Sequence, residues 1–203
     1  MTLVPSLNTM KPWLVLYILC IIGFAPEHLQ ADSEQGEKCL TKTCFVTSRT
    51  APTGETLQIV GASRYRFWGF SVYSVALYQE ATKAPKRWSE YPLVLELSYH
   101  RSLKAEDFTK TAKKLMGENP EYGTEVESAV FQQFASFIRP VSEGDRYTLL
   151  YSPDGTLELL FNGKTQGRVQ DQSFARAYIG MWLGKHAVKE DNRDAILSGQ
   201  FEG

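Results

Sequence analysis

Arg64 is the residue whose setting most clearly suggests chemistry. It lies in the segment Gly61-Ala62-Ser63-Arg64-Tyr65-Arg66, which brings two arginines into an apolar strand region. One of the two can point outward as a solvated charge. If the other points inward, it needs an anion, because a buried unpaired guanidinium is very costly. Strand periodicity alone favours the solvated interpretation.

Two cysteines, Cys39 and Cys44, remain outside the apolar N-terminal segment. An even count in an oxidising compartment predicts a disulfide, and the four intervening residues can form its small loop. A metal site is the alternative, but no second cysteine pair is present, and His28, His100 and His186 lack ligand spacing. The spacing also differs from that of a redox CxxC motif. We therefore expect no metal.

Other catalytic patterns are missing from the sequence. It contains no GxSxG elbow, no P-loop and no GxGxxG between a strand and a helix. The acidic pairs Glu106-Asp107 and Glu190-Asp191 stand at predicted helix starts, where the helix dipole accounts for them. Taken alone, the residues predict no catalytic centre and no cofactor.

The N-terminus predicts export. Lys11 is followed by an uncharged apolar run from Trp13 to Ala25, which suits the h-region of a signal peptide and is short for a spanning helix of roughly twenty residues. The small residue that ends Leu29-Gln30-Ala31 predicts cleavage there, which makes residues 1–31 a signal peptide. The alternative is an uncleaved anchor that holds the domain at the membrane.

Length and composition predict one globular domain plus an extension. The chain has 203 residues, of which 43% are hydrophobic and 22% charged, which excludes disordered and collagen-like classes. Its 22 Lys and Arg balance 23 Asp and Glu, and no basic run could follow a phosphate backbone. We expect no nucleic-acid partner.

Turn signals and hydrophobic alternation divide the chain into elements. Residues 32–54 are polar and are interpreted as a linker tail tied down by the disulfide, ahead of a domain at residues 55–203. Turns at Pro153-Asp154-Gly155 and Asn162-Gly163 separate three late strands. The predicted strands are Thr56–Arg66, Phe67–Gln79 (covered on both faces and therefore central), Leu93–Tyr99, Arg146–Ser152, Thr156–Phe161 and a short one after it.

Helical signals follow or separate these strands. The predicted helices are Leu103–Met116, Thr124–Ile138 with a capping box at Thr124 and Glu127, a helix opened by Asp171, and Asp191–Leu197. The second helix carries apolar residues at helical spacing, which core packing explains better than a ligand-lining role: Val126, Val130, Phe134, Phe137 and Ile138.

Four segments carry a resemblance to a known family. They are Gly61 to Tyr78, Ser152-Pro153-Asp154-Gly155-Thr156-Leu157, Phe174-Ala175-Arg176 and Trp182-Leu183-Gly184-Lys185-His186. Together they resemble the chalcone isomerase fold, and in particular bacterial exported chalcone isomerase-like proteins, over Leu57 to Gly199. The resemblance implies an α+β open-faced β-sandwich: a large, mainly antiparallel sheet covered by a helical layer, with a ligand cleft between them.

The same resemblance bears on catalysis. In chalcone isomerases an arginine near the domain start polarises the substrate ketone, and Arg64 matches that position. The enzyme also uses a strand Thr, a helix Tyr and Asn, and a late Ser or Thr, where this chain has Tyr73, Phe108, Leu115 and Met181. Most hydrogen bonds that would orient a ketone and a water are thereby removed, so chalcone cyclisation is not expected.

Plant fatty-acid-binding members of the fold are similar in keeping the arginine, which meets a carboxylate. Together with the predicted export, the resemblance implies a non-catalytic periplasmic binder of a fatty acid or similar amphiphilic carboxylate. Membrane contact would run only through an uncleaved N-terminal segment. The alternatives are an isomerase or lyase of unknown substrate and a protein-interaction domain of the cell envelope. The implied ligand-binding residues are Arg64, Tyr73, Phe108, Leu115 and Met181.

Overall fold

The computed structural model describes residues 36–121, 126 and 128–202. The predicted signal peptide at residues 1–31 and the predicted capping box at Thr124 and Glu127 lie outside these residues. None of the helices within the described residues has the length and apolar character needed to cross a bilayer.

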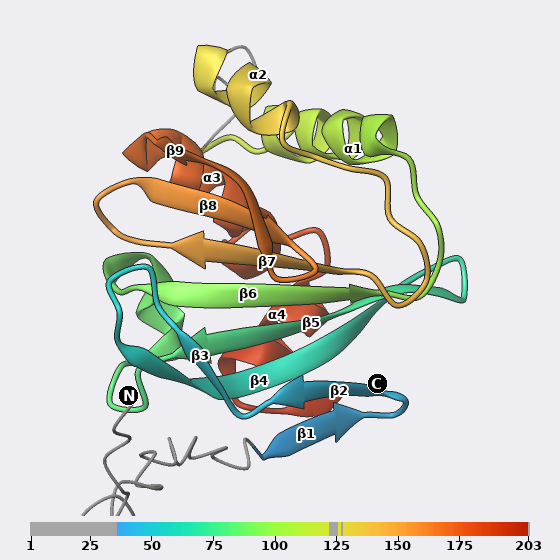
Figure 1. Ribbon diagram of the computed structural model, residues 1–203, viewed down its shortest axis with the longest axis vertical. Helices are drawn as coiled ribbons and strands as arrows, with labels where there is room; N and C mark the ends of the chain where they lie inside the picture. Colours follow the sequence, from blue (N-terminus) through green and yellow to red (C-terminus); the bar gives the residue numbers. More distant parts are fainter. Residues whose placement is uncertain (1–35, 122–125, 127, 203) are drawn as a thin grey trace, which may run out of the picture. The chain divides into compact units, whose positions relative to one another are not determined.

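A large sheet of eight strands forms the framework (Figure 1). Its order is β10-β4-β5-β6-β7-β8-β9, and β3 pairs with β4 beside this path. Neighbours are antiparallel, except for the parallel pair of β10 and β4. The strands are β3 (Ser48–Thr50), β4 (Thr56–Phe67), β5 (Phe70–Gln79), β6 (Leu93–Tyr99), β7 (Arg146–Tyr151), β8 (Thr156–Phe161), β9 (Lys164–Gln170) and β10 (Phe201–Glu202).

Alternation of side chains along the strands builds two cores, one on each face. In β7, Tyr147, Leu149 and Tyr151 are buried in the larger core, as their spacing predicts. Every residue of β6 is buried, because this strand lies mid-sheet with both faces covered. The predicted central position of β5 is confirmed, since it lies between β4 and β6.

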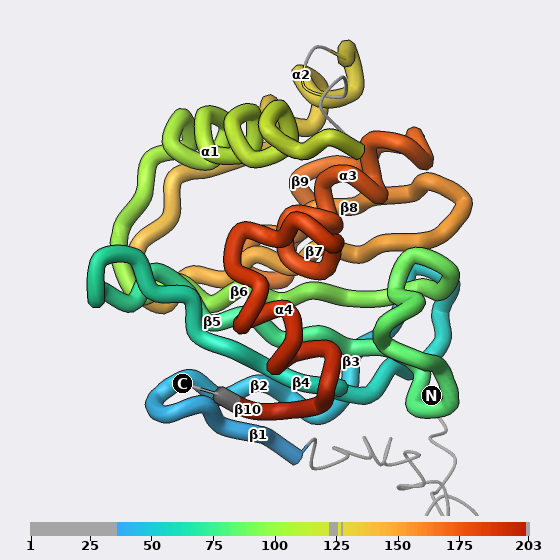
Figure 2. Tube along the Cα trace, turned by 180° about the vertical axis from the view of Figure 1, so that it is seen from behind, coloured from blue at the N-terminus to red at the C-terminus, as the bar shows by residue number. Residues whose placement is uncertain are grey.

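Helices cover one face of the sheet (Figure 2). They are α1 (Ala105–Gly117), α2 (Ala129–Ala135), α3 (Gln172–Leu183) and α4 (Glu190–Leu197), with a 3-10 helix, η1 (Pro85–Glu90), between β5 and β6. The predicted opening of α3 is confirmed, because the Asp171 carboxylate accepts a hydrogen bond from the Phe174 amide at 2.9 Å. The α+β architecture, a large antiparallel sheet under a helical layer, is thus the one expected.

The helix α2 is shorter than the predicted span to Ile138. The Ser128 hydroxyl accepts a hydrogen bond from the Phe131 amide at 3.1 Å and caps the helix, which ends at Ala135. The predicted core role of this segment holds for Phe134 and Ile138, which are buried in the larger core.

The polar segment before the domain is not the linker tail that we expected. Residues of β1 (Glu37–Leu40) and β2 (Thr43–Val46) form a hairpin, and the predicted disulfide joins Cys39 to Cys44 across it. Phe45 is fully buried in the smaller core, on the sheet face opposite the helices. One apolar side chain on a polar hairpin was too weak a signal to separate a strand from a linker.

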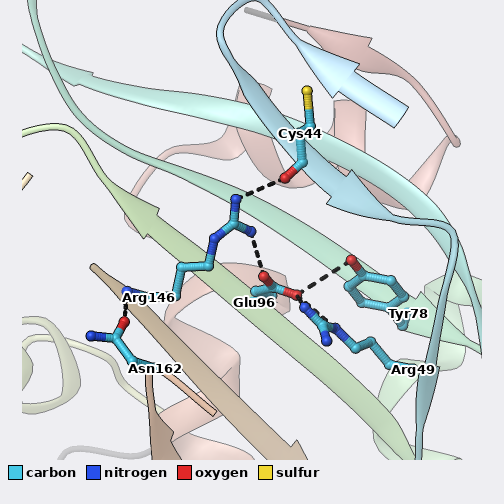
Figure 3. Close-up of polar contacts among 6 residues, drawn as sticks. All are labelled: Cys44, Arg49, Tyr78, Glu96, Arg146 and Asn162. Atoms are coloured by element: carbon cyan, nitrogen blue, oxygen red, sulfur yellow. Dashed lines mark hydrogen bonds and ion pairs between the residues drawn. The ribbon is translucent and has the colours of Figure 1, made fainter. Parts of the chain in front are cut away.

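A buried glutamate attaches this segment to the sheet (Figure 3). Glu96, on β6, is fully buried and accepts hydrogen bonds from Arg49 at 2.8 Å and from Arg146 at 2.5 Å. Arg146 also donates to the Cys44 carbonyl at 2.8 Å, and the Tyr78 hydroxyl lies 3.4 Å from the same carboxylate. The charge is therefore paired and hydrogen-bonded, as a buried carboxylate requires.

Candidate binding cavity

A cavity of about 310 Å³ lies between the helix-covered face of the sheet and the helices α1 and α3. Its walls are mostly apolar and aromatic. The strands and their loops contribute Tyr65, Phe67, Val72, Tyr73, Leu97, Tyr99, Arg101 and Leu103, and the helical layer contributes Asp107, Phe108, Thr111, Ala112, Leu115, Tyr178, Met181, Trp182 and Val188.

Sequence periodicity explains why these residues meet. On α1, Phe108, Thr111, Ala112 and Leu115 follow helical i, i+3, i+4 and i+7 spacing and share one face. Tyr178, Met181 and Trp182 do the same on α3. Along β6, Leu97 and Tyr99 alternate onto the facing side of the sheet.

Aromatic rings organise the strand side of the cavity. The rings of Tyr65 and Tyr73 stack with centroids 4.9 Å apart, and the Tyr99 ring meets Tyr73 edge-on at 6.0 Å. Trp182 donates a hydrogen bond from Nε1 to the Tyr73 hydroxyl at 3.1 Å, which joins α3 to β5. The cavity therefore has a rigid aromatic lining with few polar atoms.

The tyrosines of the lining stay neutral at physiological pH. Burial raises the pKa of the Tyr73, Tyr99 and Tyr178 phenols, and to a smaller degree that of Tyr65, because the phenolate would lose its hydration. These hydroxyls can donate or accept hydrogen bonds without carrying charge.

Two charged side chains, Arg101 and Asp107, belong to the lining, and both are exposed. Asp107 accepts a hydrogen bond from the Lys104 amide at 3.1 Å, which is its role in the first turn of α1. Arg101 lies two residues beyond the end of β6 and supplies the cation of the lining. Chemically, this arrangement is an apolar cavity with an ionic rim.

Four of the five predicted ligand-binding residues line this one cavity: Tyr73, Phe108, Leu115 and Met181. The fifth, Arg64, does not, so its expected position inside the cleft is wrong. Arg64 pairs in register with Ser74, whereas the neighbouring pair of Tyr65 and Tyr73 faces the cavity. Arg64 thus lies on the opposite face of the sheet.

A β-bulge is the physical reason for that placement. Leu57 and Ile59 point into the smaller core, and strict alternation would send residue 64 to the other face. The register shifts between Ile59 and Gly61, so that Ala62 returns to the smaller core and Arg64 follows it. A single inserted residue therefore turns the predicted arginine away from the cavity.

On its own face, Arg64 belongs to a small polar cluster. Its guanidinium donates to the Leu40 carbonyl at 3.1 Å and so contacts the N-terminal hairpin. Beside it, the Ser74 hydroxyl and His100 Nε2 are 2.8 Å apart. Burial lowers the pKa of His100, the nearby Arg64 charge lowers it further, and Glu143 acts in the opposite sense.

Sequence reasoning missed Arg101, although a signal was present. Residues 93, 95, 97 and 99 alternate onto the cavity side of β6, and continuing that period by one step reaches residue 101.

Within the described residues, one acidic and sulfur cluster is close enough to hold a metal ion, Glu37 with Cys39 and Cys44, but its two sulfurs form the disulfide.

Comparisons with known proteins agree on the fold. Residues 42–198 match the family described as chalcone isomerase-like. Among solved structures, the chain is similar to a fatty-acid binding protein of Arabidopsis thaliana, with 14% sequence identity and a TM-score of 0.56, over 74% of this chain and 96% of that one. No curated protein matches the chain.

Proposed function

Because the chain belongs to the chalcone isomerase-like family, we propose that it is a non-catalytic binding protein for a small amphiphilic carboxylate such as a fatty acid. One observation carries the proposal: the cavity between sheet and helices is lined by apolar and aromatic side chains and has Arg101 in its lining. The likeness in fold to a fatty-acid binding protein supports it.

Different residues of the lining suit the hydrocarbon tail and the carboxylate of such a ligand. Leu115, Met181 and Phe108 can take the hydrocarbon tail, and each buried methylene contributes about 0.8 kcal/mol. The carboxylate would meet Arg101, whose planar guanidinium can donate two parallel hydrogen bonds. This assignment moves the head group from Arg64, the residue implied by the family resemblance, to Arg101.

Calorimetric titration with one fatty acid and its alcohol tests the proposal. Arg101→Gln should weaken binding of the acid about fivefold, because an exposed ion pair contributes up to about 1 kcal/mol, and should leave the alcohol unchanged. Arg168→Gln is the matched control, since Arg168 is exposed on β9 and outside the lining. Equal losses for acid and alcohol, or no binding by the parent protein, would contradict the proposal.

We further propose that this binding protein is exported to the periplasm. The apolar run after Lys11 supports export, and so does the Cys39–Cys44 disulfide, because disulfides persist in oxidising compartments. Sequencing the N-terminus of the fractionated protein should find a chain that begins at Asp32. Recovery of the whole run from Trp13 to Ala25 would establish the membrane anchor instead.

A further inference from the structure

The turn between β4 and β5 exposes three aromatic side chains. Phe67, Trp68 and Phe70 are 57%, 86% and 68% exposed, and they are the exposed large hydrophobic residues of the described chain. We call this group, together with Gly69, the aromatic tip. The hairpin that carries it projects beyond the neighbouring loops at one end of the sheet (Figures 1 and 2).

The backbone of the aromatic tip makes this choice of residues unexpected. Trp68 and Gly69 have φ values of 51° and 80°, so both residues of the turn adopt a left-handed conformation. Such turns favour Asn, Asp or Gly, and a bulky residue there is strained. The Trp68 ring lies 6.1 Å from that of Phe67 and is otherwise open to solvent. Packing therefore does not explain a tryptophan at this position.

The hairpin that carries the tip is positively charged. The hairpin from Thr56 to Gln79 contains no Asp or Glu, but it contains Arg64 and Arg66. Arg66 is exposed next to the tip, and the cavity lining nearby carries one exposed cation, Arg101, and one exposed carboxylate, Asp107. Exposed Trp and Phe flanked by arginine are typical of segments that lie in the headgroup region of a bilayer.

The tip is also continuous with the cavity. Phe67 is more than half exposed, yet its side chain lines the cavity together with Arg101. A surface that contacts the tip would therefore lie at the rim of the cavity, where an amphiphile would enter or leave.

We propose that the aromatic tip docks on an anionic lipid bilayer, with Trp68 and Phe70 in the headgroup region, and that the cavity exchanges its amphiphile there. Docking stands independently of the ligand, whereas the exchange step rests on the proposed function. This contact is in addition to any made by the N-terminal segment.

Fluorine NMR of the full chain labelled with fluorotryptophan tests the docking residue by residue. The apolar N-terminal segment can bind vesicles by itself, so total binding is uninformative. The Trp68 resonance is assigned with Trp68→Phe, and Trp88, which is 7% exposed in η1 at the other end of β5, is the internal control. Vesicles contain phosphatidylcholine, with or without phosphatidylglycerol, and a headgroup spin label.

We expect the Trp68 resonance to broaden at least severalfold more than that of Trp88, and more strongly on vesicles that contain phosphatidylglycerol. Equal broadening of the two resonances would overturn the docking and leave a protein partner as the occupant of the tip. Equal broadening of Trp68 on neutral and anionic vesicles would overturn the preference for an anionic surface.

Transfer of a dansyl-labelled fatty acid from vesicles tests the exchange step. The double variant Trp68→Ser with Phe70→Ser should slow transfer about tenfold and leave the affinity in solution unchanged, because neither side chain lines the cavity. Arg66→Glu should also slow it, whereas Arg168→Glu, with the same charge change on β9, should not. Unchanged transfer in the tip variants would overturn the exchange step. Absence of solution binding by the parent would instead refute the proposed function and leave the NMR result standing.

Discussion

At the scale of single residues, one bulge decides which arginine reaches the cavity. The register shift between Ile59 and Gly61 turns Arg64 toward the N-terminal hairpin, and the end of β6 brings Arg101 to the lining. The other residues implied by the family resemblance line the cavity, because positions such as Tyr73 and Met181 lie on regular elements. It failed for Arg64 because a bulge leaves no clear mark in the hydrophobic pattern of one sequence.

His100 makes stability depend on pH at this same cluster. Its pKa is lowered in the folded state, so the unfolded chain binds the proton first, and stability falls as pH drops below the unfolded value of about 6.5. His100→Gln should reduce this loss between neutral and mildly acidic pH. The difference should stay below about 1 kcal/mol, because the ring is only half-buried. Urea unfolding of both proteins across pH measures it, and parallel curves would contradict the assignment.

At the scale of elements, side chains of the large sheet and its smaller core attach the N-terminal strands, whose own hairpin is closed by the disulfide. The hairpin of β1 and β2 is two short strands, which are marginal alone. Phe45 anchors it in the smaller core, and Glu96 attaches both β3, through Arg49, and β2, through Arg146. These contacts join residues far apart in sequence, so local composition predicted only a polar tail.

Glu96→Gln should therefore loosen the N-terminal strands. The substitution removes the carboxylate from two guanidinium groups, and breaking such a buried pair costs on the order of 3 kcal/mol. Hydrogen exchange should quicken most at the amides of β1 to β3. Glu90→Gln is the control, because Glu90 forms an exposed ion pair with Arg87 at 3.2 Å. Equal exchange in the two variants would contradict this role of Glu96.

Most other elements were predictable because their signals are local. Leu93–Tyr99 and Thr156–Phe161 match the observed strands, since turn residues and alternation mark both ends. The start of α3 follows from Asp171 as its cap. The end of α2 could not be predicted from the sequence pattern, because the apolar stripe continues past Ala135 into a turn that packs on the same core.

At the scale of the whole molecule, the chain is a large sheet with one helical layer, and its fold is similar to that of a solved structure. The cavity lies where these two layers separate, between the strands near the aromatic tip and the helices α1 and α3. The resemblance predicted a cleft between the layers, but its lining and rim depend on side-chain directions that only the structure supplies. The cavity lies at the end of the sheet that carries the aromatic tip, so the cavity and the tip form one continuous surface.

Native mass spectrometry of protein taken directly from its host tests the central claim, that this cavity holds an amphiphile. The parent chain should carry the mass of one small amphiphilic acid. Leu115→Trp should lose it, because Leu115 is half-buried and lines the cavity from α1, so a larger side chain would take up part of the space. Lys110→Trp, an exposed position on the same helix outside the lining, should keep it. A parent chain without bound mass, or equal occupancy in the two tryptophan variants, would contradict the account.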